Sequence, residues 1–218
     1  MKRLLDIILS FSALVLLAPF FVPVIVILKF TGEGEIFYIQ ERSGRDGNSF
    51  GLYKFATMLK NSPNIGAGEI TIRDDSRVLP FGKFLRKTKL NELPQLWNIF
   101  IGDMSLVGPR PMVLNTYKYY PEAARRKLDM IRPGLTGIGS IVFRDEERYL
   151  ANQDEPMKFY RDHIIPYKSD LELWFVQNNT IWLYIKIIIV TAWVVIFPSS
   201  NIADKAFVGI PRLPESLI

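Results

Sequence analysis

The residues best suited to chemistry form a short polar group in front of an apolar helical run. Asn91 and Glu92 stand directly before the run, Arg86 and Lys89 lie upstream of it, and Arg110 follows in a turn. Backbone N–H groups at a helix start attract anions, and flanking cations add to that attraction. The spacing therefore predicts an anion-binding site that suits a phosphorylated ligand. The alternative is an ordinary surface helix with a capped start.

Composition narrows the chemistry further. The chain has 218 residues, no Cys and a single His, His163. A thiolate nucleophile or Cys-based zinc site is excluded, and a Ser-His-Asp triad is not expected. Carboxylates, amides, Lys and Arg remain, which fits phosphoryl transfer assisted by Mg²⁺. The net charge of +5 is compatible with phosphorylated substrates or an anionic membrane. We expect no nucleic-acid partner, because the basic residues form no stripe.

An apolar run without charge covers residues 7–28 and is long enough to enter a membrane. Pro19 and Pro23 interrupt it, and each removes a helical hydrogen bond. Basic residues flank both ends, with Lys2 on one side and Lys29 on the other. Two basic ends and a central break favour a hairpin that enters the membrane and returns to the same face. A Pro-kinked spanning helix is the alternative.

The rest of the chain predicts an α+β, mostly helical domain. Residues 35–40 and 49–55 have the composition of strands, 112–130 form a basic amphipathic helix, and 181–197 form a buried or interfacial helix. The charged groups at 73–77 and 145–148 are expected on solvated surfaces. Lys54, on the second strand, is either a phosphate contact or a solvated edge lysine. Arg132, in the turn at 132–137, either contacts a ligand or belongs to a plain loop.

Several motifs together resemble the bacterial sugar transferase family, in particular the small, minimal type of monotopic polyprenyl-phosphate phosphoglycosyl transferase. They occur in the same order as in that family and cover nearly the whole chain. The motifs are the N-terminal run with Pro19, KFATM at 54–58, NELPQL at 91–96, GDMSLVGPRP at 102–111, RPGLTG at 132–137 and FVQNNT at 175–180.

The resemblance implies a reaction and a location. Such enzymes transfer a phosphosugar from a UDP-sugar to undecaprenyl phosphate, release UMP and need Mg²⁺. This step begins the assembly of O-antigen, capsule or exopolysaccharide. The implied protein is monotopic and lies among phospholipids on the cytoplasmic face of the bacterial inner membrane, with a homodimer as a further possibility. Its expected parts are a re-entrant hairpin (1–30), a catalytic domain with interfacial helices (31–198) and a tail (199–218).

The resemblance also implies roles for single residues. Glu92 is the catalytic carboxylate or metal ligand, and Asn91 occupies the nucleophile and second metal-ligand position. Arg86, Arg110, Arg132 and Lys54 are the phosphate-binding candidates. The structural residues are Asp103, which closes a helix, Pro109 and Pro111, which stiffen the turn of Arg110, and Pro19 and Pro23.

One departure from the family pattern concerns the nucleophile. The family usually has Asp-Glu where this chain has Asn91-Glu92, and an amide is a much weaker nucleophile than a carboxylate. Three interpretations follow. The chain is an active variant that uses Glu92 or direct attack by the lipid phosphate, an inactivated or engineered form, or a protein that binds these substrates without turnover. We favour the active variant.

Overall fold

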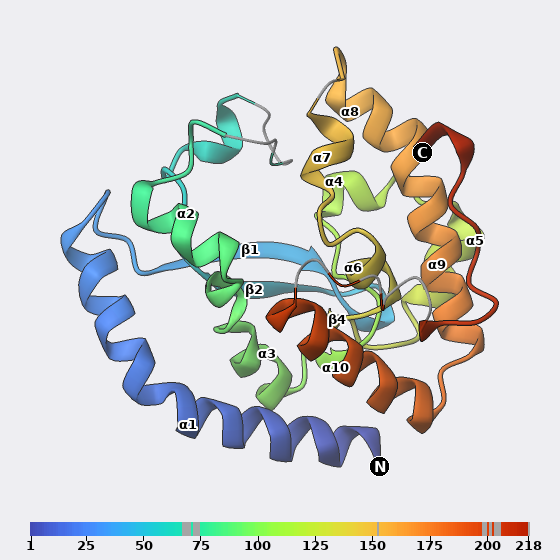
Figure 1. Ribbon diagram of the computed structural model, residues 1–218, viewed down its shortest axis with the longest axis horizontal. Helices are drawn as coiled ribbons and strands as arrows, with labels where there is room; N and C mark the ends of the chain where they lie inside the picture. Colours follow the sequence, from blue (N-terminus) through green and yellow to red (C-terminus); the bar gives the residue numbers. More distant parts are fainter. Residues whose placement is uncertain are drawn as a thin grey trace.

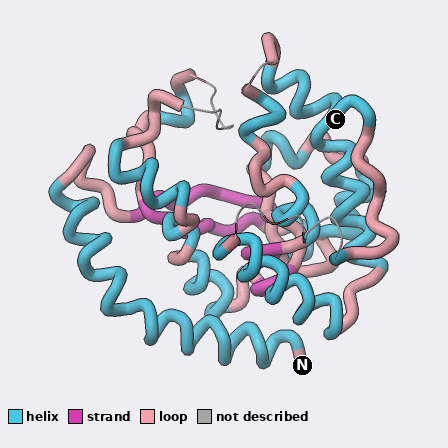
Figure 2. The backbone as a smooth tube through the Cα atoms, viewed as in Figure 1, coloured by secondary structure: helices cyan, strands magenta, loops and turns pink. Residues whose placement is uncertain are grey.

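The computed structural model describes residues 1–66, 71, 75–151, 153–197, 200, 202 and 206–217. Its helices are α1 (Lys2–Phe30), α2 (Pro80–Lys87), α3 (Gln95–Ile101), α4 (Leu114–Tyr117), α5 (Glu122–Leu128), α6 (Ile138–Val142), α7 (Glu147–Leu150), α8 (Pro156–Phe159), α9 (Ile165–Gln177) and α10 (Ile181–Ile196). Its strands are β1 (Phe37–Ser43), β2 (Ser49–Phe55), β3 (Ser105–Val107) and β4 (Gly134–Thr136). Single turns of helix are η1 (Arg45–Gly47), η2 (Ser62–Asn64), η3 (Leu90–Glu92), the π-helical η4 (Tyr160–Ile164) and η5 (Glu215–Leu217). The predicted α+β, mostly helical class is confirmed (Figure 2).

Two small sheets organise the domain. β1 and β2 form an antiparallel hairpin in which Tyr38 lies opposite Lys54, as the two predicted strands require. β3 and β4 pair in parallel, and this pairing was not predicted. It depends on glycine, because a Cβ at Gly108 would collide with the carbonyl oxygen of Arg132. The turn predicted at 132–137 is therefore partly a strand that holds the loop after β3.

The N-terminal run forms one helix, α1, which is helical from Lys2 to Phe30 with both prolines inside it. Figure 1 shows it curving along the outside of the domain. Among the described residues it is the one helix long and apolar enough to cross a membrane, by length and composition alone. Only 6% of its most apolar window is buried, so α1 is not a core helix. The structure shows one bent helix in place of two arms, and membrane re-entry stays a prediction.

Both ends of α1 pack on the same domain. At the start, Asp6 is 2% exposed, and its Oδ1 accepts hydrogen bonds from Ser105 Oγ, the Leu106 N–H and Tyr184 Oη. At the end, Leu28 packs in a small core with Phe55 and Leu85. The middle of the helix exposes large apolar side chains, which include Phe11, Val15, Leu16, Phe20 and Val22. The helix therefore lies along the domain with an apolar face turned outward.

Replacing Asp6 with Ala is expected to lower the free energy of unfolding by about 3 kcal/mol, because three buried donors lose their acceptor. The measurement is thermal or denaturant unfolding in detergent. Asp170→Ala, at an exposed position of α9, is the matched control and should change stability by less than about 0.5 kcal/mol. Equal free energies of unfolding for Asp6→Ala and Asp170→Ala would contradict the role given to Asp6.

The main core lies between the C-terminal helices. Ile164, Leu171 and Phe175 pack there against Tyr184 and Ile187 of α10. The opposite face of α10 is exposed, and its largest exposed side chains are Trp182, Ile189, Trp193 and Ile196. The predicted tail also contributes to this core through Phe207 and Leu217, whereas residues 198, 199, 201, 203–205 and 218 lie outside the described residues.

The single amphipathic helix predicted over 112–130 is wrong. The structure has two short helices, α4 and α5, separated at Pro121. Proline has no N–H to continue a helix, and here it serves as the N-cap of α5. Tyr120, Ala124 and Leu128 are buried, so this segment packs into the domain.

Candidate active site

The core of the candidate site is an ion pair between Glu92 and Arg110. The Arg110 Nη2 lies 3.1 Å from Glu92 Oε1. Glu92 ends η3, which the chain enters through Lys89 in the left-handed conformation (φ 59°). A non-glycine residue in that conformation costs free energy and is found where the surroundings enforce it. This sharp turn separates α2 from η3 and sets the direction in which the Glu92 side chain points.

Two cations of the hairpin lie within electrostatic reach of this pair. Lys54 of β2 was predicted as a candidate, and Arg42 of β1 was missed. The Arg42 Nη1 donates to the carbonyl oxygen of Pro111, 3.2 Å away, and its Nε donates to Gln40 Oε1. Arg42 therefore contacts the same loop that carries Arg110. The strand predicted over residues 35–40 ends before Arg42, whereas β1 continues to Ser43 and places Arg42 at a partly buried position.

We call Arg42, Lys54, Arg86 and Arg110 the cationic cluster. Burial, together with Arg42, Arg110 and Arg86, lowers the pKa of Lys54 to about 7, and Glu92 partly opposes the shift. Burial alone would raise the pKa of Glu92, but Arg110, Lys54 and Lys89 outweigh it and lower that pKa to about 2. Glu92 is thus ionised at neutral pH, and one carboxylate faces several cations. The excess positive charge suits a phosphate or diphosphate group.

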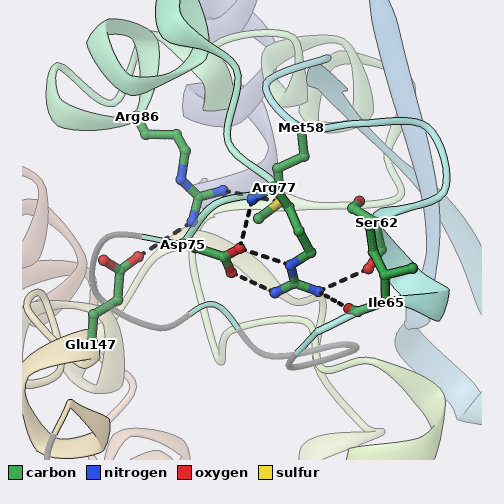
Figure 3. Close-up of polar contacts among 7 residues, drawn as sticks. All are labelled: Met58, Ser62, Ile65, Asp75, Arg77, Arg86 and Glu147. Carbon is green, nitrogen blue, oxygen red and sulfur yellow. Dashed lines mark hydrogen bonds and ion pairs between the residues drawn. The ribbon is translucent and has the colours of Figure 1, made fainter.

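Arg86 reaches across to the other side of the site. Its Nη2 lies 3.3 Å from Glu147 Oε1 of α7. Figure 3 shows the two side chains pointing toward each other. The neighbouring Glu146 pairs with the buried Lys168 of α9 at 2.6 Å. The prediction that 145–148 is merely a solvated face is therefore wrong for these two glutamates. Tertiary packing brings α7 against α9 and opposite α2, and no local pattern encodes that approach.

The charged loop before α2 has a structural role. The guanidinium of Arg77 bonds both carboxylate oxygens of Asp75 and the carbonyl oxygens of Ser62 and Ile65 (Figure 3). Arg77 and Asp75 are both buried, so these two residues do not form the solvated loop that was predicted. Arg73 and Asp74, from the same predicted group, lie outside the described residues.

A buried carboxylate of α9 holds the loop that carries Arg110. The Arg110 N–H donates to Glu172 Oε1 at 3.3 Å, and Pro109 accepts from the Gly134 N–H at 2.8 Å. Glu172 is 4% exposed, and burial raises its pKa to about 7. A side chain at Gly139 would collide with that carboxylate. Sequence reasoning missed Glu172, since nothing local separates it from the surface acids of the same helix.

Two predicted residues lie at the other end of α3. The Arg132 Nε donates to the carbonyl oxygen of Gly102 at 2.8 Å, and Asp103 accepts from the Asn98 side chain at 3.2 Å. Glu92 precedes α3 and Gly102 follows it. The side chain of Arg132 is thus directed away from the Glu92–Arg110 pair. Asp103 supports Asn98, which also bonds the backbone of β2.

Sequence comparison with known proteins identifies the family. Residues 1–198 match the sequence profile of the bacterial sugar transferases. The chain belongs to this family. An exopolysaccharide production protein ExoY from Sinorhizobium fredii is 40% identical over 162 residues, which cover 68% of this chain and 71% of that protein. An undecaprenyl-phosphate galactose phosphotransferase from Salmonella typhimurium is 33% identical over 211 residues, which cover 90% of this chain and 40% of that protein.

A UDP-glucose:undecaprenyl-phosphate glucose-1-phosphate transferase from Klebsiella pneumoniae is 32% identical over 195 residues. These cover 88% of this sugar transferase and 39% of that relative. The chain thus spans about two fifths of the length of these longer relatives. The shared region contains both partners of the Glu92–Arg110 pair.

Asn91, at the predicted nucleophile position of this sugar transferase, is buried beside Glu92. Within the described residues no three His, Asp or Glu side chains gather into a metal site. Mg²⁺ commonly binds through one or two carboxylates together with substrate phosphate oxygens. The ionised Glu92 and the amide oxygen of Asn91 fit this type of Mg²⁺ site, in which phosphate oxygens of the substrate complete the coordination.

Proposed function

We propose that this sugar transferase moves a sugar phosphate from a UDP-sugar to undecaprenyl phosphate, which gives a polyprenyl-diphosphate sugar and UMP. The observation that carries the proposal is the ionised Glu92 paired with Arg110 inside the cationic cluster. Named relatives use undecaprenyl phosphate and UDP-sugars, which supports the same substrates here. The product would serve as the first lipid-linked intermediate of a surface polysaccharide.

In this proposal the chain's own residues bind and position two phosphorylated groups. Arg110 and Arg86 neutralise the diphosphate, since Arg makes paired contacts with phosphate oxygens. Lys54 adds charge, because a bound anion favours its protonated form. In a direct route, an oxygen of the lipid phosphate forms the bond to the sugar-linked phosphorus as the bond to UMP breaks. In a two-step route, the Glu92 carboxylate forms that bond as UMP leaves, and the lipid phosphate then attacks the same phosphorus and releases Glu92. Positioning and charge neutralisation dominate such transfers.

Mg²⁺ would be held by Glu92, with Asn91 as a neutral second ligand. When bound, the ion supplies charge neutralisation at the diphosphate and favours departure of UMP. The pKa of about 2 keeps Glu92 available as an anionic ligand across the physiological range. Arg110 then orients that carboxylate.

The arrangement of α1 supports seating on one face of the membrane. A helix of 29 residues is about 43 Å long at 1.5 Å per residue. Its two ends pack on the same domain, so a docked α1 would not place them on opposite sides of a bilayer. Its outer face is apolar, and α10 and α3 add the exposed Trp182 and Trp97. We propose a monotopic protein on the cytoplasmic face of the inner membrane, with α1 dipping into the lipid and returning.

The test is an incubation of the purified protein with radiolabelled UDP-sugars, undecaprenyl phosphate and Mg²⁺. The proposal requires a lipid-extractable labelled product with at least one sugar of the panel. Asn91 favours a second candidate, a protein that binds these substrates without turnover. Binding of the UDP-sugar without any lipid-linked product would establish that second function and reject the first.

Asn91→Asp is expected to increase the amount of covalent phosphosugar intermediate by about tenfold, because a carboxylate is a far better nucleophile than an amide. Mass spectrometry of the protein after incubation with the UDP-sugar alone measures the adduct. Asn61→Asp, at an exposed position, is the control and should leave the adduct unchanged. An Asn91→Asp protein with no more adduct than the parent would show that position 91 is not the nucleophile.

Glu147→Gln is expected to tighten binding of a UDP-sugar by about two- to fivefold, which is the range of a partly exposed ion pair. Glu147 competes with the substrate phosphates for Arg86, and Gln removes that competing charge. Calorimetric titration measures the affinity. Glu155→Gln, which breaks the exposed pair with Lys158, should have no effect. Unchanged affinity in Glu147→Gln would mean that Arg86 does not contact the phosphates.

A further inference from the structure

A second cationic site lies at the far end of α3 from Glu92. It is an open cavity of about 250 Å³ at the start of α1. Four of its lining residues are cations, namely Lys2, Arg3, Arg45 and Arg132, and they come from three separate segments of the chain. We call this the basic cavity. The cationic cluster of the active site shares no residue with it.

The acidic residue in the basic cavity is already engaged. Asp6 lines it, but this carboxylate is 2% exposed and accepts three hydrogen bonds at Oδ1. Arg45 lies 3.4 Å from Asp46, and both side chains are about half exposed to solvent or more. The four cations thus exceed the acids around them, and an anion would complete the cavity.

Three of the cations are held by backbone contacts. The Nζ of Lys2 donates to the carbonyl oxygen of Asn179 at 2.7 Å. The Nη atoms of Arg3 donate to the carbonyl oxygens of Ile99 and Phe100, at the end of α3. Arg132 donates through its Nε to Gly102. Within the part of the chain that the structure describes, no residue accepts a hydrogen bond from the Nη groups of Arg132. These donors remain for a ligand, and they are the type that binds phosphate in pairs.

The surroundings of the basic cavity indicate which anion it binds. Leu4, next to Lys2 and Arg3, is 62% exposed, and Trp182, at the start of α10, is 78% exposed. Ile101 at the end of α3 is exposed as well. Each of these apolar residues lies within three positions, along the chain, of a residue that lines the cavity or accepts a hydrogen bond from one of its cations. This combination matches a lipid with an anionic head group and apolar chains.

We propose that the basic cavity binds the phosphate of an anionic membrane phospholipid, at a site separate from the substrate phosphates. Arg132 and Arg45 contact the head group, and the acyl chains lie along the apolar side chains of α1 and α10. This inference depends on the membrane seating proposed above. The bound lipid would hold the first turn of α1 and the end of α3 at the depth of the head groups.

The experiment uses the full chain in uncharged detergent micelles at physiological salt. Thermal unfolding is followed while short-chain dihexanoyl phosphatidylglycerol or dihexanoyl phosphatidylcholine is added. We expect phosphatidylglycerol to raise the unfolding midpoint and phosphatidylcholine to leave it unchanged. Arg132→Gln and Arg45→Gln should each weaken the apparent affinity for phosphatidylglycerol by about five- to tenfold, as loss of one charged contact predicts. Arg161→Gln, which removes the same charge from an exposed site on η4, should not.

Three outcomes would overturn the proposal. These are equal stabilisation by the two lipids, equal loss of binding in Arg161→Gln, and full stabilisation by inorganic phosphate alone, which would identify a free-phosphate site. Arg45→Gln guards against misfolding, because Arg45 is exposed and its replacement leaves the backbone contacts of Arg132 in place. Transfer activity is measured separately on the same samples. A protein without transfer activity can still pass this lipid test, so failure of the proposed function is distinguished from failure of the lipid site.

Discussion

Glu92→Gln is expected to reduce kcat for sugar-phosphate transfer by about 10²–10³-fold, the usual effect of removing one group that stabilises charge in a transition state. Glutamine has nearly the same shape but carries no charge, so it weakens both Mg²⁺ binding and the orientation of Arg110. With a pKa of about 2, Glu92 stays ionised until the pH falls well below 4. The charge lost in the variant is therefore present in the native protein at every pH used for the assay.

The measurement for Glu92 is product formation at saturating UDP-sugar and Mg²⁺. Glu122→Gln, at an exposed position of α5 where Glu122 pairs with Arg126, is the control for general loss of an acidic residue. Unfolding curves should show both variants folded at the assay temperature. Glu92→Gln is expected to be less stable than the parent, because a carboxyl whose pKa is lowered in the folded state stabilises the fold at neutral pH. Full turnover by Glu92→Gln would remove Glu92 from the mechanism and, with it, the observation on which the proposed function rests.

Arg110→Lys is expected to lower kcat/KM by about 10³-fold, at the lower end of what an arginine on a transferring phosphate contributes. Lysine keeps the charge but makes no paired contact with phosphate oxygens. The shorter side chain also loses its fixed position beside Glu92, where the native Nη2 lies at 3.1 Å. If Arg110 acts chiefly on the transition state, kcat should carry most of the loss, whereas a role in substrate binding alone would raise KM.

The control for Arg110 is Arg126→Lys on α5, where the native side chain is 72% exposed. The same assay should detect no change in that protein. Binding of the UDP-sugar, measured separately from turnover, shows whether the variant has lost its loop structure or only the chemical role of Arg110. Because Glu172 accepts a hydrogen bond from the Arg110 backbone and not from its side chain, the loop should keep its place in Arg110→Lys. A variant that binds UDP-sugar normally and turns it over normally would show that Arg110 belongs to the structure of the loop alone.

Local signals identified the central pair because its residues lie in informative contexts. Glu92 precedes an apolar helical run, and Arg110 lies in a turn stiffened by Pro109 and Pro111. The hairpin was predictable for the same reason, since strand composition and turn residues act over short distances. The prediction of one helix over 112–130 was wrong because it relied on the charge pattern and neglected Pro121. Proline has no N–H, so the helical hydrogen bonds are interrupted there.

The residues that surround the Glu92–Arg110 pair are brought there by tertiary contacts, which the spacing of residues in the sequence does not encode. Arg42 joined the cationic cluster only because β1 extends to Ser43, and Glu172 lies under the loop because α9 packs there. Arg132 shows the reverse. Its place in a motif suggested the substrate site, whereas its side chain bonds Gly102 at the opposite end of α3.

What the sequence alone determined is the range of possible chemistry. A chain without Cys and with a single His must work through carboxylates, amides and cations, and its apolar N-terminal run and motifs restricted the family. Only the tertiary structure decided that α1 is one bent helix docked at both ends, that Arg110, Lys54 and Arg42 lie within electrostatic reach of Glu92, and that a second group of cations lines a cavity at the start of α1. The physical reason is that composition and local backbone preferences act within a few residues, whereas charge clusters depend on which distant side chains the core brings together.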